Sequence, residues 1–168
     1  MKQFEDNYKV KVKNLVNATI GIKFPQSNLR RDWIKRGQIL PIPFGQLQEA
    51  IFDPGIEYMF REGMLGIDDL EVKQALGLEP EDVEEPVNII ILDDSQKERY
   101  LRNLPFKEFK EKIGELPKEQ IKQLCDYAIE HEIADIAKAD YLKKLGYVDI
   151  VRAIQLNRED KEEVNEKE

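Results

Sequence analysis

The amino-acid sequence predicts an α+β fold, with a small N-terminal antiparallel sheet and short helices followed by a C-terminal helical bundle. Strict alternation of apolar and polar residues occurs only near the N-terminus, and this period of two indicates half-buried strands. Apolar residues at helical spacing dominate the second half of the chain. No apolar run approaches the ~20 residues that span a bilayer, so we expect no membrane segment.

The first two strands are expected in the segments "YKVKVKNL" and "TIGIKF", residues 8–15 and 19–24. In the first segment Val10 and Val12 alternate with lysines, which predicts one buried face and one basic face. The intervening residues "NLVNA" are a plausible hairpin loop, so we expect the two strands to pair with each other.

Two further strands are expected in "NLRRDWI" and "ILPIPF", residues 28–34 and 39–44. Alternation in the first places Leu29, Arg31 and Trp33 on one face. The prolines of the second, Pro41 and Pro43, cannot donate to a β-ladder, which predicts an edge strand.

Short helices are predicted over residues 45–52, 55–65 and 68–77 from their helical spacing. Asp53-Pro54-Gly55 is expected to stop the first, and the last is expected to be capped by Asp68 or Asp69 and closed by Gly77. The acidic stretch "EPEDVEEP", residues 79–86, then predicts an exposed linker. We therefore expect a β-rich basic N-terminal domain over residues 1–78 and a domain boundary at this linker.

The second domain is predicted to be helical over residues 87–156. Ser95 and Glu98 match a capping box that would open its first helix, and Pro105 and Pro117 would open the next two. The acidic tail, residues 157–168, contains a single apolar residue, which predicts a helix that frays into disorder.

The composition argues against catalysis, because the hydroxyl, thiol and imidazole groups that most mechanisms require are scarce. Cys125 and His131 are the only cysteine and histidine, and Ser27, Ser95 and Thr19 are the only residues with an aliphatic hydroxyl. A disulfide framework needs pairs of cysteines, and a conventional zinc site needs several Cys and His ligands, so one cysteine and one histidine provide neither. We therefore predict no enzyme activity, no catalytic residue and no cofactor.

Two carboxylate groups are candidate oxygen ligands for a divalent cation: Asp68, Asp69 and Glu71 in one, and Asp93 with Asp94 in the other. Both stand at predicted helix starts, where aspartate caps free N–H groups. Because capping accounts for them, we predict no metal site.

Positive charge is concentrated at one end of this acidic chain. The net charge is −8, yet residues 1–48 hold nine Lys and Arg against three Asp and Glu, a net +6 that leaves −14 elsewhere. The densest cluster surrounds the only tryptophan and comprises Arg30, Arg31, Trp33, Lys35 and Arg36. Arginine and tryptophan are preferred interface residues, so we predict a docking surface for acidic partners with Trp33 as a partly buried anchor.

Two alternatives use other surfaces or partners. Arginines around an indole can also bind phosphates and stack bases, so the basic sheet could serve a nucleic-acid-binding or regulatory protein, although the acidic remainder disfavours it. A second candidate interface is a cluster of apolar residues around a Pro-Gly turn: Phe52, Tyr58, Met59, Phe60, Met64 and Leu65. Most of these residues are expected in the core, and any surplus would serve as a subunit interface.

Four segments resemble small proteins encoded among the virion genes of tailed bacteriophages and prophages. They are Val10–Leu15, Arg30–Gly37, Ile42–Leu47 and Asp53–Ile67, in a chain that continues into a helical half. The resemblance implies a structural protein: a virion component or assembly factor, in the virion and in the host cytoplasm during assembly. Its partners would be other virion proteins, such as an acidic capsid surface, or further copies of itself.

Overall fold

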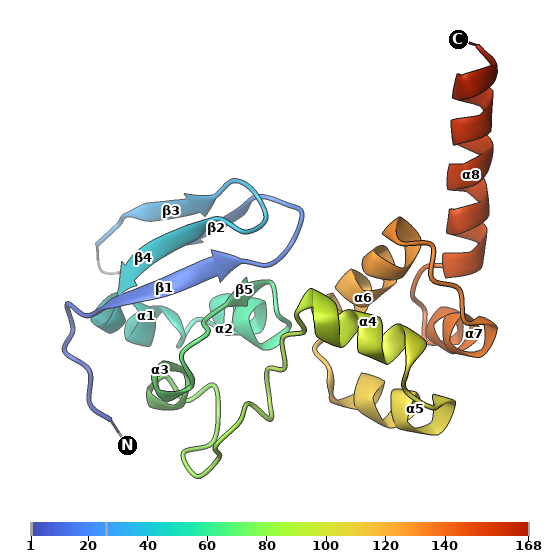
Figure 1. Cartoon of the computed structure of the whole chain (residues 1–168). Coiled ribbons are helices and arrows are strands. Elements are labelled where there is room, and N and C mark those ends of the chain that lie inside the picture. The colour runs from blue at the N-terminus through green and yellow to red at the C-terminus, as the bar shows by residue number, and fades with distance from the viewer. Residues whose placement is uncertain (1, 26, 168) are drawn as a thin grey trace. The chain divides into compact units, whose positions relative to one another are not determined.

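The computed structural model describes residues 2–25 and 27–167, and these form two compact units (Figure 1). The N-terminal unit contains the described residues up to Ile91 together with Leu116–Glu119. The C-terminal unit contains Leu92–Glu115 and the residues from Gln120 onward. The first holds all the strands and the second is helical, so the predicted α+β class is confirmed.

Five short strands form two antiparallel sheets in the N-terminal unit. Strand β1 (Lys9–Asn14) lies between β4 (Ile39–Pro43) and β5 (Leu65–Gly66), and β2 (Ile20–Lys23) pairs with β3 (Arg30–Trp33). The predicted hairpin between the first two strands is therefore wrong: each of them pairs with a strand later in the chain.

The side chain of Asn14 explains why the chain does not reverse directly after β1. Its Oδ1 accepts a hydrogen bond from the backbone N–H of Val16, and its Nδ2 donates to the carbonyl of Ala18. Asn14 is fully buried, so these bonds fix the conformation of the following residues. The chain is thereby led into the second sheet, where β2 meets β3.

The predicted edge position of "ILPIPF" is confirmed, because β4 pairs only with β1 in the three-stranded sheet. The register places Ile42 opposite Val10 and Leu40 opposite Val12. The alternating apolar residues of the strands pack in one core with residues of the short helices. The largest fully buried members of that core are Trp33, Phe24, Phe60, Ile22, Ile42, Leu47, Leu65 and Leu78.

Three helices complete this core: α1 (Phe44–Ala50), α2 (Pro54–Arg61) and α3 (Leu70–Ala75). The predicted cap of α3 is confirmed at Asp69, whereas Asp53, which was expected to stop the preceding helix, also caps α2. Asp53 accepts hydrogen bonds from the backbone N–H groups of residues 55 and 56, and Asp69 accepts from those of residues 71 and 72. Side-chain acceptors of this kind satisfy donors that the first helical turn leaves free.

The acidic stretch 79–86 departs from the prediction at its first residue. Glu79 is only 4% exposed, and its carboxylate accepts hydrogen bonds from the backbone N–H groups of Val87, Asn88 and Ile89. The residues up to Ile91 consequently belong to the N-terminal unit, beyond the expected boundary. Glu81, Asp82, Glu84 and Glu85 are exposed as expected.

The C-terminal unit consists of five helices: α4 (Asp94–Arg102), α5 (Phe106–Glu115), α6 (Lys118–Glu130, which begins in the N-terminal unit), α7 (Ile136–Lys144) and α8 (Ile150–Glu166). The capping box that opens α4 is formed by Asp93 and Gln96, so the predicted pair Ser95 and Glu98 is wrong. Asp93 is the N-cap residue because its extended backbone conformation lets its carboxylate accept a hydrogen bond from the N–H of Gln96.

A buried lysine from another helix binds the last carbonyl groups of α4. Lys138 of α7 is 3% exposed, and its Nζ donates to the carbonyls of Tyr100 and Leu101 at 2.9 and 3.0 Å. Burial lowers the pKa of this amine. The last carbonyls of α4 therefore find their partner on another helix rather than in solvent.

The acidic tail is helical rather than disordered, because α8 runs without a break to Glu166. Tail residues 157–167 are exposed, and Arg158 pairs with Glu132 through two N–O contacts of 3.2 Å. The expected disorder is therefore wrong. Glutamate, lysine and arginine have good helix propensities, which let α8 extend beyond its buried first turns.

The buried position of Cys125 predicts an unreactive thiol. Cys125 is 1% exposed on α6, and burial, with a smaller contribution from Asp126, raises its pKa to about 12. Because the thiolate is the reactive form, we expect Ellman's reagent at pH 8 to label the folded protein more than about 100-fold slower than the protein in denaturant. Labelling at equal rates would show that the thiol is accessible in the native state.

Candidate protein-binding surface

The solvent face of β1 carries a row of three lysines. Val10 and Val12 are buried, whereas Lys9 and Lys11 are exposed and Lys13 is half-buried. Alternate residues of a strand lie about 7 Å apart, so three ammonium groups follow one face at regular spacing. Among the residues that the structure describes, no carboxylate forms an ion pair with any of these lysines. We call Lys9, Lys11 and Lys13 the lysine row.

Exposed apolar side chains lie beside the lysine row on the neighbouring strand. The register of β1 and β4 places Lys13 opposite Ile39, Lys11 opposite Pro41 and Lys9 opposite Pro43. Residues that face each other across two strands project on the same side of the sheet. Ile39 is 50% exposed and Pro41 is also exposed, so this face offers apolar contact area beside its charges.

Four of the five predicted site residues are exposed basic side chains. Arg30 lies on β3, where its Nε forms an ion pair with Asp32 at 2.8 Å, and Arg31 follows it on the strand. Lys35 and Arg36 occupy the turn between β3 and β4. Gly37 of this turn donates to the carbonyl of Asn14, the residue after Lys13. The turn thus brings Lys35 and Arg36 to the end of the lysine row.

Trp33 does not belong to the surface. Its side chain is fully buried, and its Nε1 donates to the carbonyl of Val12 at 2.9 Å. The expectation of a partly buried anchor is therefore corrected: the indole supports β1 from inside the core. The structure separates it from the charges of Arg30, because β3 directs alternate residues to opposite faces.

Sequence reasoning missed the lysine row as part of the site, although its signal was present. The alternation around Val10 and Val12 shows that the lysines share a face. It does not show that Ile39 and Pro41 lie beside them, because that depends on which strand pairs with β1. The candidate surface is therefore better described by β1, β4 and the β3–β4 turn than by the surroundings of Trp33.

The cluster of apolar residues around the Pro-Gly turn is divided between core and surface. Phe60 and Leu65 are buried, and Met59 and Met64 are half-buried. Phe52 is 83% exposed and Tyr58 is 54% exposed. A surplus of aromatic surface therefore exists on α2 and the turn before it.

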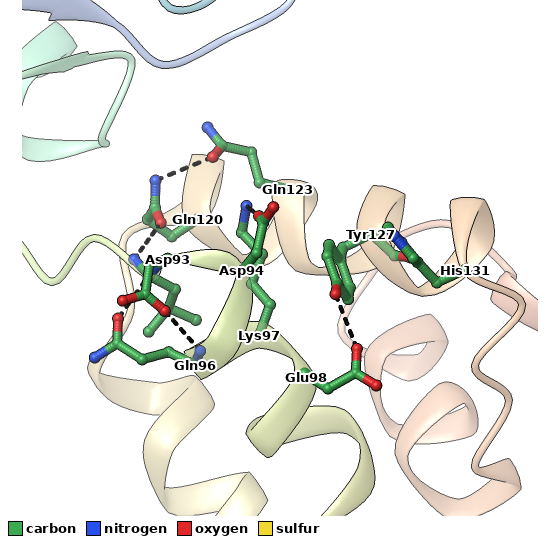
Figure 2. Close-up of polar contacts among 10 residues, drawn as sticks. Asp93, Asp94, Gln96, Lys97, Glu98, Gln120, Gln123, Tyr127 and His131 are labelled. Atoms are coloured by element: carbon green, nitrogen blue, oxygen red, sulfur yellow. Dashed lines mark hydrogen bonds and ion pairs between the residues drawn. The ribbon is translucent and has the colours of Figure 1, made fainter.

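The only histidine lies in a polar cluster between α4 and α6 (Figure 2). Tyr127 donates from its hydroxyl to Glu98 at 2.8 Å, and the His131 ring stacks on the Tyr127 ring with centroids 4.0 Å apart. The hydrogen bond raises the pKa of Tyr127; together with the bond from Arg102 it lowers the pKa of Glu98. Near neutral pH the phenol is thus neutral and the carboxylate ionised, an arrangement that ties two helices together.

One aspartate in each of the two carboxylate groups considered as metal ligands caps a helix. Asp69 and Asp93 accept hydrogen bonds from the first turns of α3 and α4. Over residues 2–25 and 27–167, no group of three or more His, Cys, Asp or Glu side chains is placed to hold a metal ion. Within the same ranges, no helix is both long enough and apolar enough to cross a membrane.

Comparison of the chain with models of protein families, with curated proteins and with solved structures gave no match. The expectation of a relationship to virion proteins therefore stays a prediction that depends on the four sequence segments alone.

Proposed function

We propose that this chain is a non-enzymatic interaction protein whose N-terminal unit docks on an acidic protein surface. The observation that carries the proposal is the lysine row beside Ile39 and Pro41. Cations without an internal partner provide long-range attraction and orientation, and adjoining apolar groups provide contact area that survives screening by salt. Lys35 and Arg36 extend the positive charge at one end.

The same surface favours a protein partner over a nucleic acid. Proteins that bind single strands present aromatic rings on which bases stack, and the indole of Trp33 is buried. Prolines and an isoleucine beside the lysines match an apolar protein surface better than a phosphate backbone. In the virion setting implied by the resemblance, the partner would be an acidic capsid or portal protein.

Charge reversal tests the proposal. Lys11→Glu combined with Arg36→Glu alters the surface, and Lys107→Glu combined with Lys167→Glu is the control, because both control residues are exposed in or next to helices of the C-terminal unit. The probes are a fluorescent peptide of alternating glutamate and valine, and single-stranded and duplex oligonucleotides. We expect peptide affinity to fall by more than about 10-fold in the first variant only, as measured by fluorescence anisotropy.

Two results would contradict the proposal. Equal peptide affinity in the wild type and the surface variant would exclude this face as the docking site. Tighter binding of an oligonucleotide than of the peptide, with a steep dependence on salt, would reassign the surface to nucleic acid.

A further inference from the structure

The backbone of β1 alternates between its two neighbouring strands. Tyr8 accepts a hydrogen bond from the N–H of Phe44, and Asn14 donates to the carbonyl of Gln38, so even-numbered residues face β4. Leu15 donates to the carbonyl of Met64, so odd-numbered residues face β5. The backbone groups of Lys9, Lys11 and Lys13 thus all point toward β5.

Strand β5 is too short to cover this edge. Its register reaches only Lys13 and Asn14, and in the part of the chain that the structure describes no strand pairs with Lys9 and Lys11 on this side. Strand β5 ends at Gly66, and the chain leaves the edge of β1 because Asp69 caps the start of α3. The N–H and C=O groups of Lys9 and Lys11 consequently form an open stretch of sheet edge.

The opposite edge of the same sheet is protected. Leu40 and Ile42 face β1, so Pro41 and Pro43 occupy two of the three positions of β4 that would donate outward. Proline has no N–H, and this is a common way in which proteins block edge-to-edge pairing. The sheet therefore has one blocked edge and one open stretch.

A cleft of about 280 Å³ lies beside the open stretch. Tyr8, Lys9 and Lys11 line one side of it, and Asp68 and Asp69 lie among the residues opposite. Ile67 and Val72, which are almost fully buried, also line the cleft. The cleft therefore combines free backbone groups with buried apolar side chains, two lysines and two aspartates.

We propose that this cleft accepts an extended segment of the acidic partner as an added antiparallel strand along Lys9–Lys11, an inference that rests on the proposed function. A residue opposite Lys11 would exchange two backbone hydrogen bonds with it and project on the same face, where the ammonium group favours glutamate or aspartate. The alternate residues would project toward Ile67 and Val72. Because Asp68 repels a continuous run of acids, the segment alternates acidic and apolar residues.

Backbone methylation of the probe separates strand addition from simple charge attraction. In the alternating peptide the glutamate N–H groups would bond to β1, whereas the valine N–H groups would face away. We expect N-methylation of the glutamates to weaken binding by more than about 10-fold and N-methylation of the valines to leave it nearly unchanged. The charge and composition of the two methylated peptides are the same, so each is a control for the other.

Amide exchange of the protein provides a second measurement. In the complex the amides of Lys9 and Lys11 should exchange more slowly, whereas those of Val10 and Val12, already bonded to β4, should not change. Equal affinity of all three peptides would overturn strand addition and leave the proposed function standing. Failure of all three to bind would overturn both. Self-association of the protein that the unmethylated peptide inhibits would identify a second copy as the occupant and overturn the assignment to a different protein.

Discussion

Replacing Trp33 with alanine should lower the free energy of unfolding of the N-terminal unit by about 3–5 kcal/mol. The indole is fully buried in the core that β1, β2 and β4 share, so its removal leaves a large cavity. The substitution also leaves the carbonyl of Val12 without the indole donor. Because Trp33 is the only tryptophan, unfolding of this variant in urea has to be followed by circular dichroism.

Trp33→Phe is the matched control, because phenylalanine keeps most of the apolar volume and lacks the donor. We expect it to cost about 1–2 kcal/mol, in the range of one buried hydrogen bond with some loss of packing. Equal stability of the alanine variant and the wild type would contradict the buried position of the indole.

Replacing Glu79 with alanine should destabilise the N-terminal unit by about 3–5 kcal/mol, because three backbone N–H groups lose their acceptor at once. The substitution also removes a negative charge that favours the protonated form of Lys73, which is 4% exposed, and this adds to the loss of stability. Burial lowers the pKa of this lysine, and the charge of Glu79 partly offsets that effect. Trp33 fluorescence in urea reports the transition, since the indole lies in the same unit.

Glu81→Ala is the control for this experiment. Glu81 lies two residues further along the same acidic stretch and is exposed, so its removal should change the free energy of unfolding by less than about 0.5 kcal/mol. Equal effects of the two substitutions would show that the carboxylate of Glu79 does not organise residues 87–89.

The sequence was informative where one residue determines a local structure. Asp69 is one of the two aspartates expected to cap α3, and Pro41 and Pro43 mark an edge strand. These features could be predicted because a cap or a missing donor acts within a few residues of its own position.

Features that depend on distant partners could not be predicted in this way. Period-two alternation shows which face of β1 is buried but not which strand lies next to it, so the pairing with β4 and β5 was missed. Glu79 stands in an acidic run typical of a linker, and only the returning chain at residues 87–89 explains its burial.

The candidate site shows the same division. The exposed positions of Arg31, Lys35 and Arg36 follow from charge alone, whereas the place of Trp33 does not. Leu29 and Trp33 have the same parity in the sequence, yet Leu29 is 45% exposed and Trp33 is fully buried. Leu29 precedes the four-residue strand β3, and only Trp33 stands opposite Ile20 over the core.

The buried amine of Lys138, which binds the last turn of α4, also determines when that turn can be completed during synthesis of the chain. Lys138 lies 37 and 38 residues after the two carbonyls to which it donates. Residues leave the ribosome in chain order, so the last turn of α4 emerges before Lys138 and at first has no such donor. That turn is therefore completed only after α7 has also emerged, so the C-terminal unit gains its full cooperativity only when both helices are outside the ribosome.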